Sequence, residues 1–196
     1  LCHDSFYLSS AAAASYTAAT KKSVKWPIDI VVSTFRMLNM KAKGSEPCVE
    51  IEKFYCTLTR SHLANMGQVL LDPPSVFGWN WEGGWVSSQT LLARYQFAVD
   101  VASSRVKGKT GFHPTDLIGE SLASSSSADP DDVVDAVTGV LGITDQLTAT
   151  ERGILLAYLT DNGASSTLDL TDSDVVNTKL HGVFALALQT PAYQLH

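Results

Sequence analysis

The residues most able to do chemistry lie in one short stretch, 73–85, where three of the four tryptophans stand among two prolines and three glycines. If Trp79, Trp81 and Trp85 are exposed, their rings form a platform on which sugar rings can stack. If they are buried, they anchor the stretch to the core, because a monomer rarely leaves so much aromatic surface in water. We expect burial, and the sugar platform is the alternative. Neither helices nor strands favour this mixture of proline and glycine, so the sequence predicts an ordered loop.

Glu82 is the single carboxylate of this stretch, and it supplies the enzymatic alternative. A hydrolase or lyase acting on an extracellular polymer would use Glu82 and a histidine such as His62 as its acid and base. Arg94 is the first cation after the loop, and we expect it to support the loop by pairing with Glu82 or with Asp72. Because His62 lies on an apolar helical stripe, we expect it to be a hydrogen-bonded core residue.

Other patterns of reactive residues are incomplete. The five histidines are scattered, and none stands four residues from another, as the ligands of a helical zinc site do. Residues 119–123 are close to a nucleophile elbow, but no strand precedes them. No glycine pattern matches a phosphate-binding loop. We therefore expect no metal and no cofactor, and we favour a structural or interaction module over a self-contained enzyme.

Charge and hydropathy exclude two further classes of partner. The net charge is −6, and no basic run compensates for it locally, which argues against nucleic acid as a ligand. A transmembrane helix needs about 20 consecutive apolar residues, and the sequence contains no such run.

The elements that must position these residues are helices. Apolar residues recur at helical spacing, whereas the alternation typical of strands hardly occurs. This pattern predicts an all-α fold, an irregular bundle of about seven helices with long loops. A short helix is expected near Asp4, longer helices over 27–40, 49–69 and 87–104, and further helices after the capping residues Asp129, Thr148 and Asp172. The inward stripe of the helix over 87–104 is expected to comprise Leu91, Leu92, Tyr95, Ala98, Val99 and Ala102.

Composition divides the chain into three parts of one domain. Residues 1–106 form a helical core that contains the tryptophan loop. Residues 107–128 are rich in glycine and serine and form a connection. Residues 129–196 supply C-terminal helices that pack on the same core.

Several motifs resemble a known family. They are Asp4 to Tyr7, Ser23 to Val32, Met66-Gly67-Gln68-Val69-Leu70, Pro73 to Trp79, Trp85-Val86-Ser87-Ser88, Leu91-Leu92-Ala93-Arg94 and Thr190 to Gln194. In this order they resemble the C-terminal part of a large, mainly bacterial family catalogued as domain of unknown function 1800. The resemblance implies an all-α fold and an exported protein, periplasmic or extracellular, and it implies no catalytic residue.

In that family a helical N-terminal half precedes these motifs. Amphipathic helices without such a partner expose apolar surface. We therefore expect an apolar patch that the N-terminal half, a second copy or another subunit covers. Glycans are a further class of partner, through the tryptophans.

Overall fold

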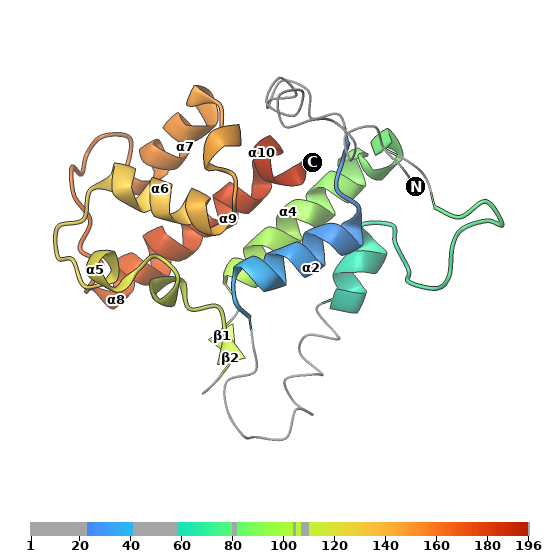
Figure 1. The fold of residues 1–196 in the computed structure, drawn as a ribbon, viewed down its shortest axis with the longest axis horizontal. Helices are drawn as coiled ribbons and strands as arrows, with labels where there is room; N and C mark the ends of the chain where they lie inside the picture. The colour runs from blue at the N-terminus through green and yellow to red at the C-terminus, as the bar shows by residue number, and fades with distance from the viewer. Residues whose placement is uncertain (1–22, 41–58, 80–81, 104, 107–109, 196) are drawn as a thin grey trace, which may run out of the picture.

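Figure 1 shows the computed structural model of the chain, which describes residues 23–40, 59–79, 82–103, 105–106 and 110–195. The described residues are mainly helical, which confirms the all-α expectation. The helices are α2 (Pro27–Met37), η3 (Glu82–Trp85), α4 (Ser88–Ala102), η4 (Pro114–Asp116), α5 (Glu120–Ala123), α6 (Pro130–Val140), η5 (Thr144–Gln146), α7 (Ala149–Leu159), α8 (Ser173–Val175), η6 (Val176–Leu180), α9 (His181–Gln189) and α10 (Pro191–Gln194). One more helix covers 59–65. The short helix expected near Asp4 lies outside the described residues.

The fold also contains one short pair of antiparallel strands among the described residues. Strand β1 (Arg105–Val106) pairs with β2 (Thr110–Gly111), with Arg105 opposite Gly111. The sequence did not indicate this pair, because two residues are too few to show an alternation.

Helices α2, α4 and α9 form the centre of the fold. Figure 1 shows α2 beside α4, and α9 packs against α4 on one side and against α6 and α7 on the other. Aromatic rings join these layers. Phe35 of α2 lies 6.1 Å from Phe97 of α4, and Phe112 meets Phe184 of α9 edge to face at 4.9 Å.

The inward face of α4 agrees with the predicted stripe at Ala98 and Ala102 and differs from it elsewhere. The residues that α4 buries are Arg94, Phe97, Ala98, Val101 and Ala102. Leu92 and Val99, which the pattern placed inward, are 67% and 44% exposed. Arg94 takes one inward position, and a hydrophobic pattern cannot assign a charged residue to the core.

Side-chain caps begin the C-terminal helices as expected. Asp129 accepts a hydrogen bond from the amide of Asp131 at 2.9 Å, at the start of α6. Thr148 and Glu151 form a capping box at the start of α7. Asp172 caps α8 in the same way as Asp129 caps α6.

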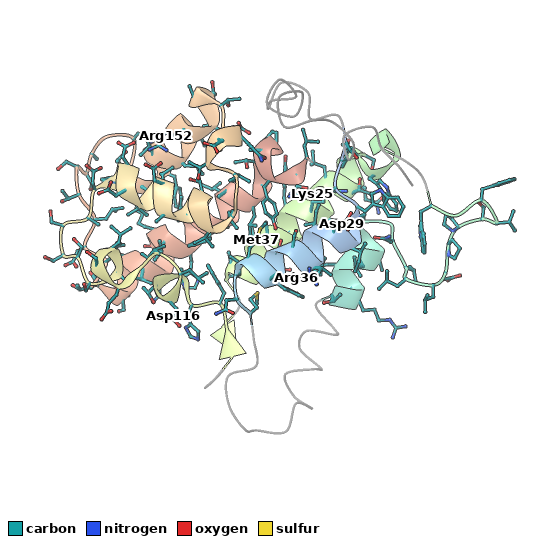
Figure 2. All side chains as sticks on the ribbon, viewed as in Figure 1. Lys25, Asp29, Arg36, Met37, Asp116 and Arg152 are labelled. Atoms are coloured by element: carbon teal, nitrogen blue, oxygen red, sulfur yellow. The ribbon has the colours of Figure 1, made fainter. Side chains whose placement is uncertain are left out.

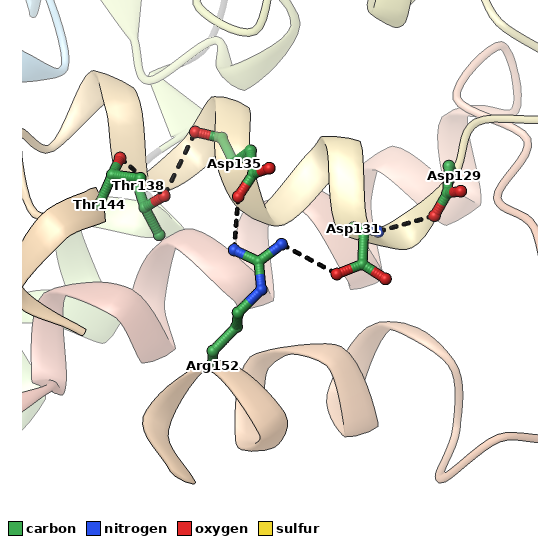
Figure 3. Close-up of polar contacts among 6 residues, drawn as sticks. All are labelled: Asp129, Asp131, Asp135, Thr138, Thr144 and Arg152. Carbon is green, nitrogen blue, oxygen red and sulfur yellow. Dashed lines mark hydrogen bonds and ion pairs between the residues drawn. The ribbon is translucent and has the colours of Figure 1, made fainter. Parts of the chain in front are cut away.

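An ion-pair bridge ties α7 to α6. Figure 3 shows Arg152 of α7 reaching two carboxylates one turn apart on α6, Asp131 at 2.9 Å and Asp135. These hydrogen bonds raise the pKa of Arg152. The hydroxyl oxygens of Thr138 and Thr144 lie 3.2 Å apart, within hydrogen-bond distance, at the far end of α6.

A single turn of π-helix, η6, connects α8 to α9. Tyr158 of α7 donates a hydrogen bond to the carbonyl of Thr178 in this turn, at 2.8 Å. The ring of Tyr158 lies so close to Gly182 that a Cβ added there would overlap the tyrosine oxygen. Gly182 is therefore the point at which α7 reaches the backbone of α9.

The helix predicted over 49–69 ends earlier than expected. Residues 49–58 lie outside the described part of the chain, and the described helix covers 59–65. Gly67, with φ of 90°, ends it. The amide of Gln68 bonds to the carbonyl of Leu63 at 2.8 Å and the amide of Gly67 to that of Ala64 at 3.0 Å, which is a Schellman motif.

Candidate functional site

The junction at the centre of the site is built around Arg94, which α4 holds with only 1% of its surface exposed. Its Nη1 donates a hydrogen bond to Oε1 of Gln194 at 3.0 Å, and its Nη2 donates to the carbonyl of Lys25 at 2.9 Å. Its Nε is buried without a hydrogen-bond partner among the described residues. Burial lowers the pKa of Arg94 to about 10, so the guanidinium stays charged at neutral pH.

This arrangement corrects one expectation about Arg94. The pair with Asp72 does not form, because Asp72 lies exposed in the loop while Arg94 is buried against Gln194 and the Lys25 carbonyl. The side chain of Glu82, the other expected partner, lies outside the described residues.

The C-terminal segment completes the junction. Gln194 also donates to the carbonyl of Leu188 at 2.8 Å, and the backbone carbonyl of Gln194 accepts from the amide of Lys25 at 3.0 Å. The ring of Tyr193 is fully buried beneath the Lys25 ammonium, which lies 4.1 Å from the ring centre. The end of the chain is thereby fastened to the start of α2.

The hydroxyl of Tyr193 reaches the inner side of α2. It lies 2.7 Å from the hydroxyl of Thr34 and 3.2 Å from that of Ser33. Burial raises the pKa of Tyr193, although these two hydrogen bonds oppose the shift. The phenol therefore acts as a neutral hydrogen-bonding group in the core.

Gln68 supplies the cap that α2 lacks. Trp26, at the N-cap position, provides no side-chain hydrogen bond. The buried amide oxygen of Gln68 accepts instead from the amide of Ile28 at 2.9 Å. Because Gly67 turns the chain at that point, the first residues after the helix over 59–65 are fixed to the start of α2.

The tryptophans separate into different environments. Trp85 is 3% exposed, and its ring lies 5.7 Å from that of Trp26, tilted by 42°. Trp79 is partly exposed, and Trp81 lies outside the described residues. Trp85 therefore anchors one end of the loop.

His62 belongs to a second polar contact on α4. Its Nε2 lies 3.1 Å from Oδ2 of Asp100, and its ring meets Phe97 edge to face at 5.3 Å. Burial lowers the pKa of His62, and the Asp100 carboxylate offsets part of this effect. His62 is 6% exposed, so the structure places it in the core with a polar partner.

Between these anchors, residues 69–79 form a loop that extends away from the helices (Figure 1). Its large apolar side chains face water, since Leu71, Val76 and Phe77 are 97%, 96% and 93% exposed. We call these three residues the loop tip. They lie around Pro73 and Pro74.

Two turns shape this loop. The first joins the amide of Asp72 to the carbonyl of Val69, and the second joins the amide of Gly78 to the carbonyl of Ser75, both at 3.0 Å. Gly78 has φ of 88°, in the region that favours glycine. Leu71 has φ of 65°, which is uncommon for a residue other than glycine, asparagine or aspartate.

Most residues of this junction stand in the sequence motifs that resemble the family, but the sequence alone assigned no role to them. Gln68, Tyr193 and Gln194 stand in such motifs, and the structure brings them together with Lys25 and Arg94. The signal that could have indicated these residues is the presence of a polar side chain within a motif that is otherwise mainly apolar.

No group of three or more histidine, cysteine, aspartate or glutamate side chains in the described ranges is arranged to hold a metal ion. None of the described helices is both long enough and apolar enough to cross a membrane.

These features define an all-α protein in which a buried polar junction holds the two ends of an exposed apolar loop. The chain belongs to the family described as "Protein of unknown function (DUF1800)", whose model matches residues 5–195. The match includes 107–170, where the sequence showed no family motif. No curated protein and no solved structure gives a significant match.

Proposed function

We propose that this chain is an exported interaction module that presents the loop 69–79 to a protein partner. The observation that carries the proposal is the exposure of the loop tip, each of whose three apolar side chains is more than 90% exposed. Contiguous apolar surface on a folded protein marks interaction sites, because leaving it in water has a free-energy cost.

The construction of the loop supports the same function. Two hydrogen-bonded turns and two adjacent prolines restrict its conformations before any partner binds. Preorganisation of this kind reduces the entropy lost on association. The backbone of Leu71 is strained and its side chain is 97% exposed, so no contact among the described residues explains the strain. A role in directing this side chain toward a partner does explain it.

Export is the part of the proposal that rests on the family resemblance alone. Fractionation of cells that make the full-length protein, with protease added to intact cells, tests it. Recovery of the protein only in the cytoplasmic fraction would contradict export.

Two other functions use the sequence candidates. Binding of glycans requires an exposed indole, and Trp79 retains partial exposure. A glycan array read by tryptophan fluorescence tests this function, and it fails if no glycan changes the emission. A hydrolase or lyase would use Glu82 with His62, and loss of polysaccharide turnover in Glu82→Gln would favour it over the interaction module.

A photocrosslinker placed at position 77 tests the interaction module directly. Benzoylphenylalanine replaces Phe77 in the full-length protein, in the cells that make it, and the adducts are identified by mass spectrometry. The matched control carries the same group in place of Ile154, which is 56% exposed on α7.

We expect adducts of discrete mass at position 77 that excess loop peptide (residues 69–79) and the Leu71→Asp change both abolish. The control position should give none of these adducts. Identical adducts at both positions, or none at position 77, would overturn the proposal.

A further inference from the structure

The loop 69–79 carries an accessible peptide bond between Phe77 and Gly78. Phe77 is 93% exposed, and a Cβ added at Gly78 would meet nothing within 4 Å among the described residues beyond its neighbours in the chain. The loop extends away from the helices in Figures 1 and 2. Exposed loop tips of this kind are the places where proteases cut folded proteins.

The backbone around this bond can open without unfolding of the helices. A single turn holds it. The amide of Gly78 donates to the carbonyl of Ser75 at 3.0 Å, and the amide of Phe77 donates to the hydroxyl of Ser75 at 3.2 Å. Both bonds lie within the loop, so water replaces them when the turn extends, and no core contact is broken.

The side chain of Phe77 selects the class of protease. An endopeptidase with an apolar primary pocket accepts a large apolar ring before the bond that it cuts. Leu71 is equally exposed, but the two prolines at 73–74 follow it and supply no amide hydrogens for binding in an extended form. Residues 75–79 contain no proline. The bond after Phe77 is therefore the better substrate of the two.

Exposure alone does not make such a site. Leu92 and Tyr158 are also exposed, but they stand within α4 and α7, where helical hydrogen bonds keep the backbone from extending. Three further phenylalanines are at most 2% exposed, namely Phe97, Phe112 and Phe184. Among the described residues, Phe77 thus combines a large apolar side chain with a backbone that a protease can reach.

Contacts on both sides of the loop hold the same segment, 25–28. Before the loop, Oε1 of Gln68 accepts from the amide of Ile28 at 2.9 Å. After the loop, Arg94 donates at 2.9 Å to the carbonyl of Lys25, which Figure 2 labels near the start of α2. Neither contact depends on a continuous loop.

Core contacts also join the two parts of the chain that a cut would separate. Phe35 lies 6.1 Å from Phe97 between ring centres, and the hydroxyl of Thr34 lies 2.7 Å from that of Tyr193. In each pair one residue precedes the loop and the other follows it. A cut in the loop therefore removes the covalent connection and leaves this packing in place.

We propose that the loop 69–79 is a site of limited proteolysis, cut between Phe77 and Gly78 by an endopeptidase that accepts large apolar side chains, and that the two fragments remain one folded particle. Water adds across the peptide bond, which leaves a carboxylate on Phe77 and an ammonium group on Gly78. This inference does not depend on the proposed function, because it requires only the exposed bond and the contacts on either side of it.

Chymotrypsin, whose primary pocket is apolar, is the probe. The full-length protein in native buffer is treated with a small amount of this protease, and mass spectrometry identifies the new termini over time. Phe77→Ala removes the apolar ring before the bond, and Leu92→Ala, at an exposed site of α4, is the matched control. Size-exclusion chromatography and circular dichroism then examine the cut protein.

We expect a new amino terminus at Gly78 before any terminus that follows one of the three buried phenylalanines. Phe77→Ala should slow this cut at least tenfold, and Leu92→Ala should leave its rate unchanged. The fragments on the two sides of the cut should elute together, retain the helical signal and separate only in denaturant.

Three outcomes would overturn this inference. They are the absence of a terminus at Gly78, a cut at this bond whose rate Phe77→Ala leaves unchanged, and fragments that elute separately in native buffer. The last outcome would show that the fold requires a continuous loop, contrary to the contacts around Lys25 and Ile28.

Discussion

Arg94 and Gln194 stand 100 residues apart in the chain and are joined by a hydrogen bond of 3.0 Å between Nη1 and Oε1. The same guanidinium also holds the carbonyl of Lys25. One side chain on α4 therefore fixes both the start of α2 and the end of the chain. Since α4 is the first long helix after the loop, with only the short helix η3 before it, this bond is part of the base on which the loop is presented.

We expect Arg94→Lys to lower the free energy of unfolding by about 1–3 kcal/mol. An ammonium cannot reproduce the planar fork that serves two acceptors, so one buried oxygen loses its partner. Urea unfolding measures the change. Leu92→Ala, on the exposed side of the same helix, should shift stability by no more than about 0.5 kcal/mol. Equal stabilities of Arg94→Lys and wild type would show that the fork is dispensable.

The stability of the protein should decrease as the pH falls below about 6.5, through His62. Burial lowers the pKa of His62 in the folded state, so the unfolded chain binds a proton at a higher pH than the folded chain. The stabilising contribution is therefore complete above the unfolded pKa and is lost as the pH falls from that value through the lower pKa of the folded state. Urea unfolding between about pH 5 and pH 8 measures it.

Two variants assign this pH dependence to His62. Asp100→Asn removes the carboxylate that supports the charged ring, and it should make the loss at low pH larger. His62→Gln should make the profile flatter, whereas His113→Gln, at an exposed position, should leave it unchanged. A profile that His62→Gln does not alter would assign the effect to another group.

Gly182→Ala should destabilise the protein by about 1–3 kcal/mol, because the new methyl group overlaps the ring of Tyr158. Gly153→Ala is the matched control within α7, where an added Cβ meets nothing within 4 Å. It should stabilise by about 0.5–1 kcal/mol through helix propensity. Thermal unfolding compares the two.

A double variant confirms the cause. Gly182→Ala should cost little once Tyr158→Ala has removed the ring, so the two changes should be strongly non-additive. Additive losses would mean that the destabilisation by the methyl group at position 182 does not come from the ring of Tyr158.

Leu71→Asn should leave the stability unchanged or raise it by about 0.5–1 kcal/mol, since asparagine tolerates a positive φ better than leucine. The same change should weaken binding of the partner, because it removes an apolar side chain from the tip. Thermal unfolding and the crosslinking yield at position 77 measure the two effects. A clear loss of stability would show instead that Leu71 is packed in the fold.

The local structure of this chain could be predicted because its signals are local. Proline at the start of α2 and the caps at Asp129, Thr148 and Asp172 act on backbone groups within a few residues of themselves. Helical spacing of apolar residues then gave the all-α class.

Tertiary structure alone decided which residues meet in the core. Nothing near Arg94 in the sequence indicates that its acceptors are Gln194 and the Lys25 carbonyl, because such partners are selected by packing between distant segments. The inward face of α4 also contains Arg94, a charged residue that a hydrophobic pattern does not place in the core. Composition also cannot separate Trp85 from Leu71, because both side chains are apolar. Packing between distant segments decides that Trp85 is 3% exposed and Leu71 is 97% exposed.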